Sequence, residues 1–590
     1  MANFIAIVDP DPDRRAAFVR ATEGTLALVP GLREGRVALG DCVVAWAAGT
    51  RAPIDVQADA TTLTVLWGDA LGTAPVGRVS AAAVADAWST REREIPTAHD
   101  GFHAALHFDV RRGITMGGDV FGIFPLYYAV RGDTLLAGSS PELFRRHPLC
   151  PALVDDEGLV GLLLAYAPFR GRTMLRGVRR LPPRHALRWQ AGTASEVLQY
   201  EIVGREGVAP ATVRDQAEWL HQQYAAAVAR HAPPALPVGM LLSGGRDSRL
   251  LCGHLGERAT GMPALTLGRP GDYEARCARA VARTLRMSLT LYELPAAELP
   301  ANAARQARWE QMGSSFGTTH TWSVVTPLGA LPPRVLTGYL RESLDFRLPD
   351  PGFDAVFSSH FNRGFHADAL RRLLRPPLRD LVDEAWLGLR AEYLASSHRA
   401  DERPWRFQLS HYARTHPGSV PWRLAFGSWP VLPILDRALL DAIASVPLDT
   451  VAARRAQDLM LRERFPQLAR LPLDRNSFDT EPLLPGRVRH RLNPAIVAAR
   501  RLASRVGLTA GERERRYYYR AYDVNGDGWR RVRAAAEPSR DAIAPLFDMD
   551  EVRRWVPSPA TRLAQTDAIH DGVRTKTLLG LMLWAADHLS

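Results

Sequence analysis

Residues 238–251 read VGMLLSGGRDSRLL, and this stretch decides the fold of the second half of the chain. An apolar strand, Val238–Leu242, runs directly into a loop with two glycines and two serines, and an amphipathic helix follows. The glycines allow a sharp turn with inward-pointing amides, the serine hydroxyls add donors, and the helix N-terminus adds a positive dipole. Strand, loop and helix in this order predict a parallel α/β sheet with an anion cradle suited to pyrophosphate.

The chemistry of this loop indicates a nucleotide. Asp247, beside the cradle, is well placed to hold Mg²⁺, which prefers carboxylate and phosphate oxygens. The loop resembles the SGGxDS loop of the ATP pyrophosphatases (PP-loop enzymes), which cleave ATP between the α and β phosphates. A Gly-Gly turn that merely joins strand to helix is the alternative, whereas a Walker A loop is excluded because no GxxxxGK[ST] motif exists. The resemblance implies that ATP is held by Leu242, Ser243, Gly244, Gly245, Arg246, Asp247 and Ser248.

Two later segments extend the resemblance to asparagine synthetases. Residues 264–268 (ALTLG) form a predicted strand before a helix at 274–285, and the resemblance places Leu267 and Gly268 beside the adenine. Residues 335–346 (VLTGYLRESLDF) resemble the family's SGEGADE motif, with Thr337 and Gly338 on its Ser-Gly and Glu342 on its Asp, the second Mg²⁺ ligand. Taken alone, these segments are also an ordinary βα unit and a polar turn after a strand.

The first half of the chain resembles a class II glutamine amidotransferase domain. The matching stretches are 109–128 (DVRRGITMGGDVFGIFPLYY) and 136–144 (LAGSSPELF), with a domain-exit hairpin at 173–189. The resemblance implies a multidomain α/β and α+β protein. An Ntn-type αββα sandwich is expected over residues 1–205, and an ATP pyrophosphatase domain with a large helical lobe over residues 206–590.

Residue 2 separates this chain from active amidotransferases. Active members expose a cysteine after Met1 is removed, and its thiol attacks glutamine with the α-amine as base. Residue 2 is Ala2 here, so we expect a degenerate glutaminase domain that is a structural remnant or a docking surface.

The C-terminal lobe supplies one further candidate. Residues 422–450 resemble the family's RVPFLD segment, and Arg475 falls roughly where the family has a lysine. Arg475 is expected to steady charge on the pentavalent phosphorus and pyrophosphate, although it is equally a surface arginine in an arginine-rich chain. The catalytic candidates are therefore Asp247, Glu342 and Arg475, with Asp247 and Glu342 as metal ligands. Glu310 and His320 are expected either to line the acceptor pocket or to be satisfied core residues.

Composition limits the other possibilities. The net charge is +11, and Lys576 is the only lysine among 74 basic residues. Arginine clamps phosphate but is a poor proton shuttle. Four scattered cysteines without a CxxC pair fit a reducing cytoplasm, and no apolar run approaches the length of a membrane span. The charge permits a tRNA-modifying PP-loop enzyme, but the amidotransferase-like half does not suit nucleic acid.

The resemblance is closest to lasso-peptide cyclases. Tyr339 replaces a family Glu, as in β-lactam synthetases and related cyclases, and with Ala2 it disfavours asparagine synthetase itself. The subgroup implies that a core peptide's Asp or Glu side chain is adenylated and joined to the peptide's N-terminal amine. Its partners would be a leader peptidase and a leader-binding recognition protein. A β-lactam synthetase-like or asparagine synthetase-like small-molecule amide ligase is the alternative.

Overall fold

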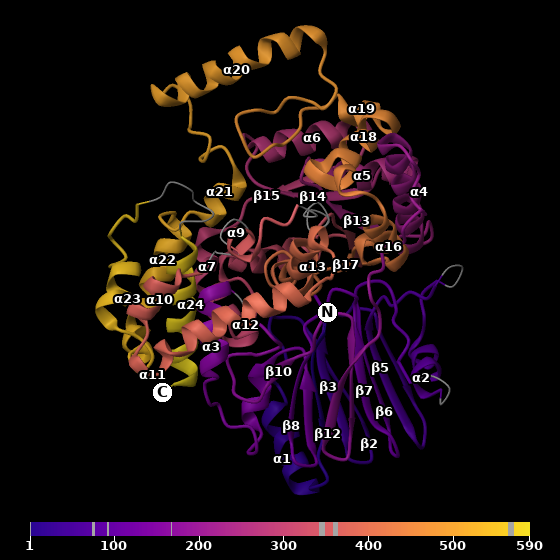
Figure 1. The fold of residues 1–590 in the computed structure, drawn as a ribbon, viewed down its shortest axis with the longest axis vertical. Coiled ribbons are helices and arrows are strands. Elements are labelled where there is room, and N and C mark those ends of the chain that lie inside the picture. The colour runs from indigo at the N-terminus through magenta and orange to yellow at the C-terminus, as the bar shows by residue number, and fades with distance from the viewer. Residues whose placement is uncertain are drawn as a thin grey trace.

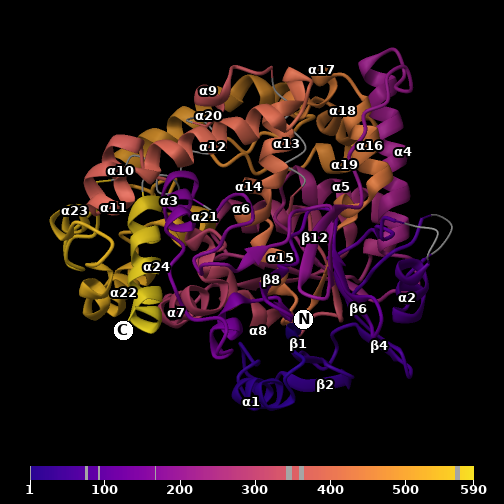
Figure 2. The same cartoon turned by 60° about the horizontal axis from the view of Figure 1, so that its bottom comes forward.

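The computed structural model describes residues 2–73, 77–90, 94–166, 168–340, 349–357, 364–564 and 572–589. Figure 1 shows an N-terminal half made of sheets below a C-terminal half of mixed helix and sheet. Figure 2 shows α1 and β2 at one end of the molecule and helices of the C-terminal lobe, such as α17 and α18, at the other.

The N-terminal half consists of two antiparallel six-stranded sheets. Their strand orders are β10-β8-β9-β1-β3-β2 and β12-β11-β7-β6-β5-β4. Phe4 of β1 stacks on Trp67 of β5 with ring centroids 4.0 Å apart, so the sheets pack face to face around a shared apolar core. The apolar runs at 63–67 and 104–108 lie within strands, as their composition predicts. The strands are β1 (Ala2–Val8), β2 (Arg33–Leu39), β3 (Cys42–Ala48), β4 (Ile54–Ala58), β5 (Thr62–Gly68), β6 (His103–Asp109), β7 (Gly113–Gly118), β8 (Tyr127–Arg131), β9 (Thr134–Gly138), β10 (Arg179–Arg180), β11 (His185–Gln190) and β12 (Thr193–Leu198).

Short helices accompany the sheets. Asp11 caps α1 by accepting hydrogen bonds from the amides of Asp13 and Arg14. Helix α2 packs its buried Val84 and Trp88 against Leu66 of β5, on the outer face of the second sheet. The sandwich expected from the resemblance is therefore present. These helices are α1 (Pro12–Thr22), α2 (Ala81–Ser89) and α3 (Asp156–Ala165).

A parallel sheet forms the centre of the C-terminal half. Its order is β15-β14-β13-β16-β17, and every neighbouring pair is parallel. The chain moves outward from β13 to β14 and β15 on one side, and to β16 and β17 on the other. The topological switch point therefore lies at the carboxyl end of β13, where open α/β sheets bind their ligands. The strands are β13 (Val238–Leu241), β14 (Pro263–Leu267), β15 (Ser288–Tyr292), β16 (Arg334–Leu336) and β17 (Trp429–Val431).

Helices surround this sheet and build the lobe beyond it. The predicted helix at 274–285 is α6, and its Ala278, Val281 and Ala282 are buried as the spacing requires. Within the described residues, no helix is long and apolar enough to span a membrane. The helices are α4 (Val213–His231), α5 (Arg246–Leu255), α6 (Tyr273–Leu285), α7 (Leu299–Glu310), α8 (Val325–Leu328), α9 (Phe353–Val356), α10 (Ala367–Leu373), α11 (Pro376–Arg379), α12 (Leu381–Ala395), α13 (Arg403–Ser410), α14 (Tyr412–Thr415), α15 (Ser419–Leu424), α16 (Arg437–Ser445), α17 (Leu448–Val451), α18 (Arg455–Arg464), α19 (Pro466–Ala469), α20 (Arg487–Arg505), α21 (Tyr517–Tyr522), α22 (Asp527–Ala536), α23 (Met549–Trp555) and α24 (Val573–His588).

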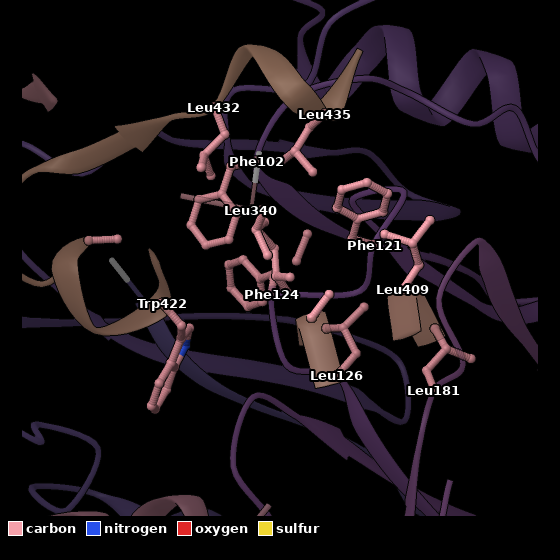
Figure 3. Close-up of a cluster of buried hydrophobic side chains, with 14 of the residues drawn as sticks. Phe102, Phe121, Phe124, Leu126, Leu181, Leu340, Leu409, Trp422, Leu432 and Leu435 are labelled. Carbon is pink, nitrogen blue, oxygen red and sulfur yellow. The ribbon is translucent and has the colours of Figure 1, made fainter. Parts of the chain in front are cut away.

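The two halves share one continuous core. Figure 3 shows Phe102 and Phe124 from the N-terminal half packed among Leu340 and Leu432 from the C-terminal half. Two buried carboxylates add ion pairs across the junction: Asp69 to Arg334 at 2.9 Å, and Asp100 to Arg230 at 2.5 Å and Arg437 at 2.7 Å.

Residues 201–210, which connect the two halves, also pack against the C-terminal half. Ile202 is buried, and the amide of Val203 donates to Asp441 of α16. The segment is therefore anchored to the C-terminal half where it leaves the sandwich, and the domain boundary between residues 205 and 206 stays a prediction.

Candidate active site

The glycine-serine loop begins where β13 ends, and β14 holds its first residue. The amide of Leu242 donates to the carbonyl of Leu265 at 3.0 Å, and Thr266 Oγ1 donates to the carbonyl of Leu242 at 2.5 Å. Leu242 is fully buried, whereas Ser243 is exposed. The backbone therefore emerges from the core to solvent at Ser243, directly at the switch point of the sheet.

Gly244 fixes the turn. Its φ is +73°, and a Cβ at this position would lie 2.5 Å from the amide nitrogen of Ala278 and 2.7 Å from Cys277 Cβ. A side chain would therefore be strained by the backbone conformation and would also collide with α6. The motif needs glycine here so that the loop can pass close to the neighbouring helix.

The loop presents donors at the start of α5. Ser243 Oγ lies 3.2 Å from Ser248 Oγ and accepts the amide of Gly245 at 3.3 Å. Gly245 is the N-cap residue of α5, so no side chain caps this helix. The helix N-terminus, with its positive dipole, thus faces the loop without a competing side-chain acceptor. This arrangement fits a phosphate-bearing ligand.

Asp247 connects the loop to two other segments. A Cβ on Gly338 would lie 2.9 Å from Asp247 Cβ, so the end of β16 contacts this aspartate directly. The Asp247 carboxylate also accepts a hydrogen bond from Gln457 Nε2 and lies 3.7 Å from Arg454 NH1. The structure thereby brings together Asp247, Thr337 and Gly338, which lie about 90 residues apart in the sequence.

Of the two predicted metal ligands, Asp247 and Glu342, the structure describes only Asp247. Glu342 lies outside the described residues, and the described part of the chain contains no group of three or more His, Cys, Asp or Glu side chains that could hold a metal. The hard carboxylate oxygens of Asp247, beside a phosphate cradle, still have the donor chemistry that Mg²⁺ requires.

The predicted adenine segment lies beside the loop, at the end of β14. The amide of Gly268 donates to the carbonyl of Tyr292 at 2.9 Å, and its φ is +133°. A Cβ there would lie 2.8 Å from an Asp272 carboxylate oxygen and 3.3 Å from Tyr517 Cβ. Leu267 and Gly268 thus lie one strand away from the loop, and their role in binding adenine stays a prediction.

The Arg475 side chain interacts with neighbouring residues of its own turn. Its Nε donates to the carbonyl of Glu481 at 3.1 Å and lies 4.0 Å from an Asp479 oxygen. The guanidinium that the structure places at the loop carboxylate is instead that of Arg454. The sequence feature that could have drawn attention to Arg454 is the basic pair Arg454-Arg455 before a helical segment.

Arg249 is a second residue that the motif did not reveal. Its fully buried guanidinium donates to the carbonyl of Gly244 at 3.1 and 3.0 Å, and to the carbonyls of Leu468 and Leu471 at 2.8 and 3.0 Å. Burial lowers its pKa to about 10. Arg249 therefore ties the loop to the segment that leads to Arg475.

Glu310 and His320 have different environments. Glu310 forms a buried ion pair with Arg423, with nitrogen–oxygen distances of 2.7 and 2.8 Å, and accepts the indole N–H of Trp322 at 3.0 Å. It is therefore a satisfied core residue. Burial lowers the pKa of His320 to about 3, and its ring lies 5.0 Å from that of Tyr522.

His320 lies in a cluster of buried aromatic side chains that extends toward Tyr339, the residue after Gly338. Burial raises the pKa of Tyr517 and of Tyr522, and Tyr339 is close enough to raise both further. Lys576 donates to the Tyr522 carbonyl, and burial lowers its pKa to about 7. The cluster places apolar and phenolic groups next to the loop, where they would keep water from a bound reactant.

Comparisons with known families agree with this geometry. A glutamine amidotransferase domain family matches residues 82–201, which run from α2 to the end of the sandwich. The asparagine synthase family matches residues 220–323, which include the loop, α5 and α6. No curated protein matches the chain. The asparagine synthase match over the loop indicates an ATP-dependent carbon–nitrogen ligase. With both domain families matched in this order, the chain is similar to asparagine synthetase-like proteins.

Proposed function

We propose that this protein is a lasso-peptide cyclase, which activates an Asp or Glu side chain of a core peptide and joins it to the peptide's own N-terminal amine. The observation that carries the proposal is an assembled adenylating loop in a chain without an accessible thiol. All four cysteines are buried, and burial raises the pKa of Cys252 and of Cys277 to about 12. Thiols in this state cannot attack glutamine, so an amine carried by the substrate is the source that we propose.

The residues of the loop account for the first half-reaction. The α5 N-terminus and the Ser243 and Ser248 hydroxyls would hold the phosphates of ATP, and Asp247 with Glu342 would hold Mg²⁺. When bound, Mg²⁺ supplies charge neutralisation on the phosphates. The peptide carboxylate then attacks the α-phosphate, so that an oxygen–phosphorus bond forms and pyrophosphate leaves. Arg454 and Arg249 keep Asp247 and Gly244 in position for this step.

The second half-reaction forms the amide. The N-terminal amine attacks the activated carbonyl, AMP leaves with the carboxylate oxygen, and the amine loses its proton. Water would compete with the amine, so the apolar wall of Tyr339, Tyr517 and Tyr522 beside the loop supports this step. Tyr339 at the end of β16 is also the residue by which the chain resembles the cyclases.

The proposal extends to partners and location. A leader peptidase would have to free the amine, and a leader-binding protein would deliver the peptide. Four cysteines without a disulfide among them are compatible with the cytoplasm.

A reconstituted reaction tests the proposal. Purified protein is incubated with ATP, Mg²⁺ and a leader-free core peptide that carries a free N-terminus and an internal Asp or Glu. We expect a product about 18 Da lighter than the peptide, formed together with AMP, because amide formation removes one water. The N-acetylated peptide serves as the control and should give no cyclic product. A peptide that stays linear while ammonia or a small β-amino acid is consumed would identify a small-molecule amide ligase instead.

A further inference from the structure

A cavity of about 350 Å³ lies between the two halves of the molecule, and its wall is rich in arginine. The N-terminal half contributes residues around β10 and β11, and the C-terminal half contributes residues around α13 and α14. Six arginines and three glutamates line it: Arg170, Arg172, Arg179, Arg180, Arg184, Arg414, Glu196, Glu310 and Glu392.

The glutamates in this wall are already paired. Glu310 is bound by Arg423, which lies outside the wall. Glu392 accepts from His411 at 3.0 Å, and Glu196 accepts from the Tyr128 hydroxyl at 2.7 Å. Glu310 is therefore committed to Arg423, and Glu196 also lies 3.4 Å from Arg179. One oxygen of Glu392 has no partner, but among the described residues this carboxylate lies beyond ion-pair distance of every arginine in the wall.

Four of the six arginines lack a carboxylate within ion-pair distance among the described residues. Arg170 interacts electrostatically with Glu392, and we call the other three, Arg180, Arg184 and Arg414, the arginine cluster. Among the described residues, none of the three lies within ion-pair distance of an Asp or Glu. Arg180 and Arg414 donate only to backbone carbonyls, including those of Gly313 and Gly122. The Arg184 guanidinium makes no hydrogen bond to another described residue, whereas its backbone carbonyl accepts the amide of Gln199 at 2.7 Å. Arg180 is 8% exposed, and its Nε has no partner.

The cluster is electrostatically strained. Burial lowers the pKa of Arg414 well below its usual value, and repulsion from Arg180 and Arg184 lowers it further. The nearby carboxylate of Asp119, which accepts the backbone amides of Phe121, Ile123 and Phe124, offsets only part of this lowering. Burial also lowers the pKa of Arg184 to about 10, with Arg406 adding repulsion. Buried like charges that face one cavity without counter-charge are costly unless a ligand neutralises them.

We propose that this cavity binds a small oxyanion, a molecule carrying a phosphate group or several carboxylates, held by Arg180 and Arg184 from one half and Arg414 from the other. The planar guanidinium forms paired hydrogen bonds to such groups. The volume suits a small molecule and excludes a folded partner. Bound there, the anion would remove repulsion across the junction and tighten the two halves. The site is separate from the adenylating loop and does not depend on the identity of the peptide substrate.

Arg184→Met is the decisive variant, because Arg184 makes no hydrogen bond that its loss would break. The matched control is Arg188→Met in β11, the strand that begins directly after Arg184, since Arg188 does not line the cavity. Each protein is titrated with inorganic phosphate and, separately, with citrate, by calorimetry and by thermal unfolding. We expect wild type and the control to bind, and Arg184→Met to bind at least about tenfold more weakly. Binding at the loop would be unaffected by this substitution.

The stability of the ligand-free proteins gives a second readout. Arg184→Met should unfold at the same or a higher temperature than wild type, because it removes an unpaired positive charge. A response to phosphate alone or to citrate alone would support the site and identify the class of anion. Equal anion binding by all three proteins, or no binding by wild type, would overturn the proposal. If Arg184→Met folds poorly, Arg184→Gln is titrated in the same way.

Discussion

Gly244 and Gly245 are neighbours in the loop with different physical requirements. Gly244→Ala should destabilise the fold by roughly 2–4 kcal/mol, from the positive φ and the collision with α6. Gly245→Ala should cost under about 1 kcal/mol, because Gly245 has a negative φ and its nearest neighbour to a Cβ is Ser243 Oγ at 3.3 Å. Urea denaturation of both variants measures the difference. Equal losses would mean that the loop does not lie against α6.

Asp247 is the residue at which the chemistry can be tested. Asp247→Asn keeps the shape of the side chain and its position beside Gly338, but removes the charge. We expect substrate-dependent AMP release to fall at least about 100-fold, because one metal ligand and its charge are lost from the transition state. Glu257→Gln, in the exposed turn after α5, is the matched control. Wild-type turnover by Asp247→Asn would mean that the loop is misassigned.

Motif residues could be predicted, but their supporting residues could not. Ser243, Gly244 and Asp247 are recognisable because the loop has to be contiguous to form its turn. Arg454 and Gln457 reach Asp247 from more than 200 residues away, through a helix whose sequence shows only an ordinary amphipathic pattern. No local pattern indicates that Arg249, one of 73 arginines, is buried under the loop. The direction in which these side chains point is decided by tertiary packing, and a single sequence does not show that packing.

At the scale of elements, Arg249 joins α5 to the segment after α18. Arg249→Met should leave the carbonyls of Gly244, Leu468 and Leu471 without their donor and destabilise the protein by roughly 3–5 kcal/mol. AMP formation should fall as well, because the Gly244 carbonyl loses its anchor. Arg283→Met on the exposed face of α6 should change stability by less than about 0.5 kcal/mol. The comparison is made by chemical denaturation, and equal midpoints for the two variants would refute the bridging role.

Helices and strands with a clear period of apolar residues could be predicted from the sequence, whereas the shortest strands could not. The helix at 274–285 and the strands around 63–67 and 104–108 follow from apolar spacing, since each buries one face or both. In contrast, β16 and β17 have three residues each, too few for a period to appear. Their place in the parallel sheet depends on pairing with β13 and with each other, which is non-local.

At the scale of the whole molecule, Asp100 couples the halves. Its buried carboxylate pairs with Arg230 and Arg437, so Asp100→Asn leaves two guanidiniums without this counter-charge. We expect a loss of roughly 3–5 kcal/mol and a calorimetric transition that separates into two, because the halves no longer unfold together. Asp86→Asn on exposed α2 is the control. A single transition at the wild-type temperature in Asp100→Asn would show that the shared apolar core alone couples the halves.

The junction was the part least accessible from sequence. Two domains are evident from the change in pattern, but the pairing of Asp69 with Arg334 and of Asp100 with Arg437 joins residues far apart in the chain. The packing of the sandwich on the parallel sheet decides which arginines face a carboxylate and which face a cavity. The arginine cluster is visible only in three dimensions for the same reason.

Acid should destabilise the molecule through its buried histidines. Burial lowers the pKa of His99 and His320 to about 3 and of His103 to about 4, so all three are neutral in the folded protein at pH 5 to 6. The unfolded chain binds these protons near the ordinary histidine pKa of about 6.5, so stability is present above that pH and is lost on acidification. Asp119 opposes this loss, because burial raises its folded pKa to about 6 and the folded state takes up its proton first.

These three histidines and Asp119 together contribute a stability slope of roughly 2–3 kcal/mol per pH unit between about pH 4 and 6. Urea denaturation at a series of pH values measures it. His320→Gln should reduce the slope by about 1 kcal/mol per pH unit, because one proton is no longer taken up on unfolding. His398→Gln, at an exposed position, should leave the slope unchanged. If His320→Gln keeps the full slope, His320 is charged in the folded protein, and the buried aromatic cluster around it must admit water.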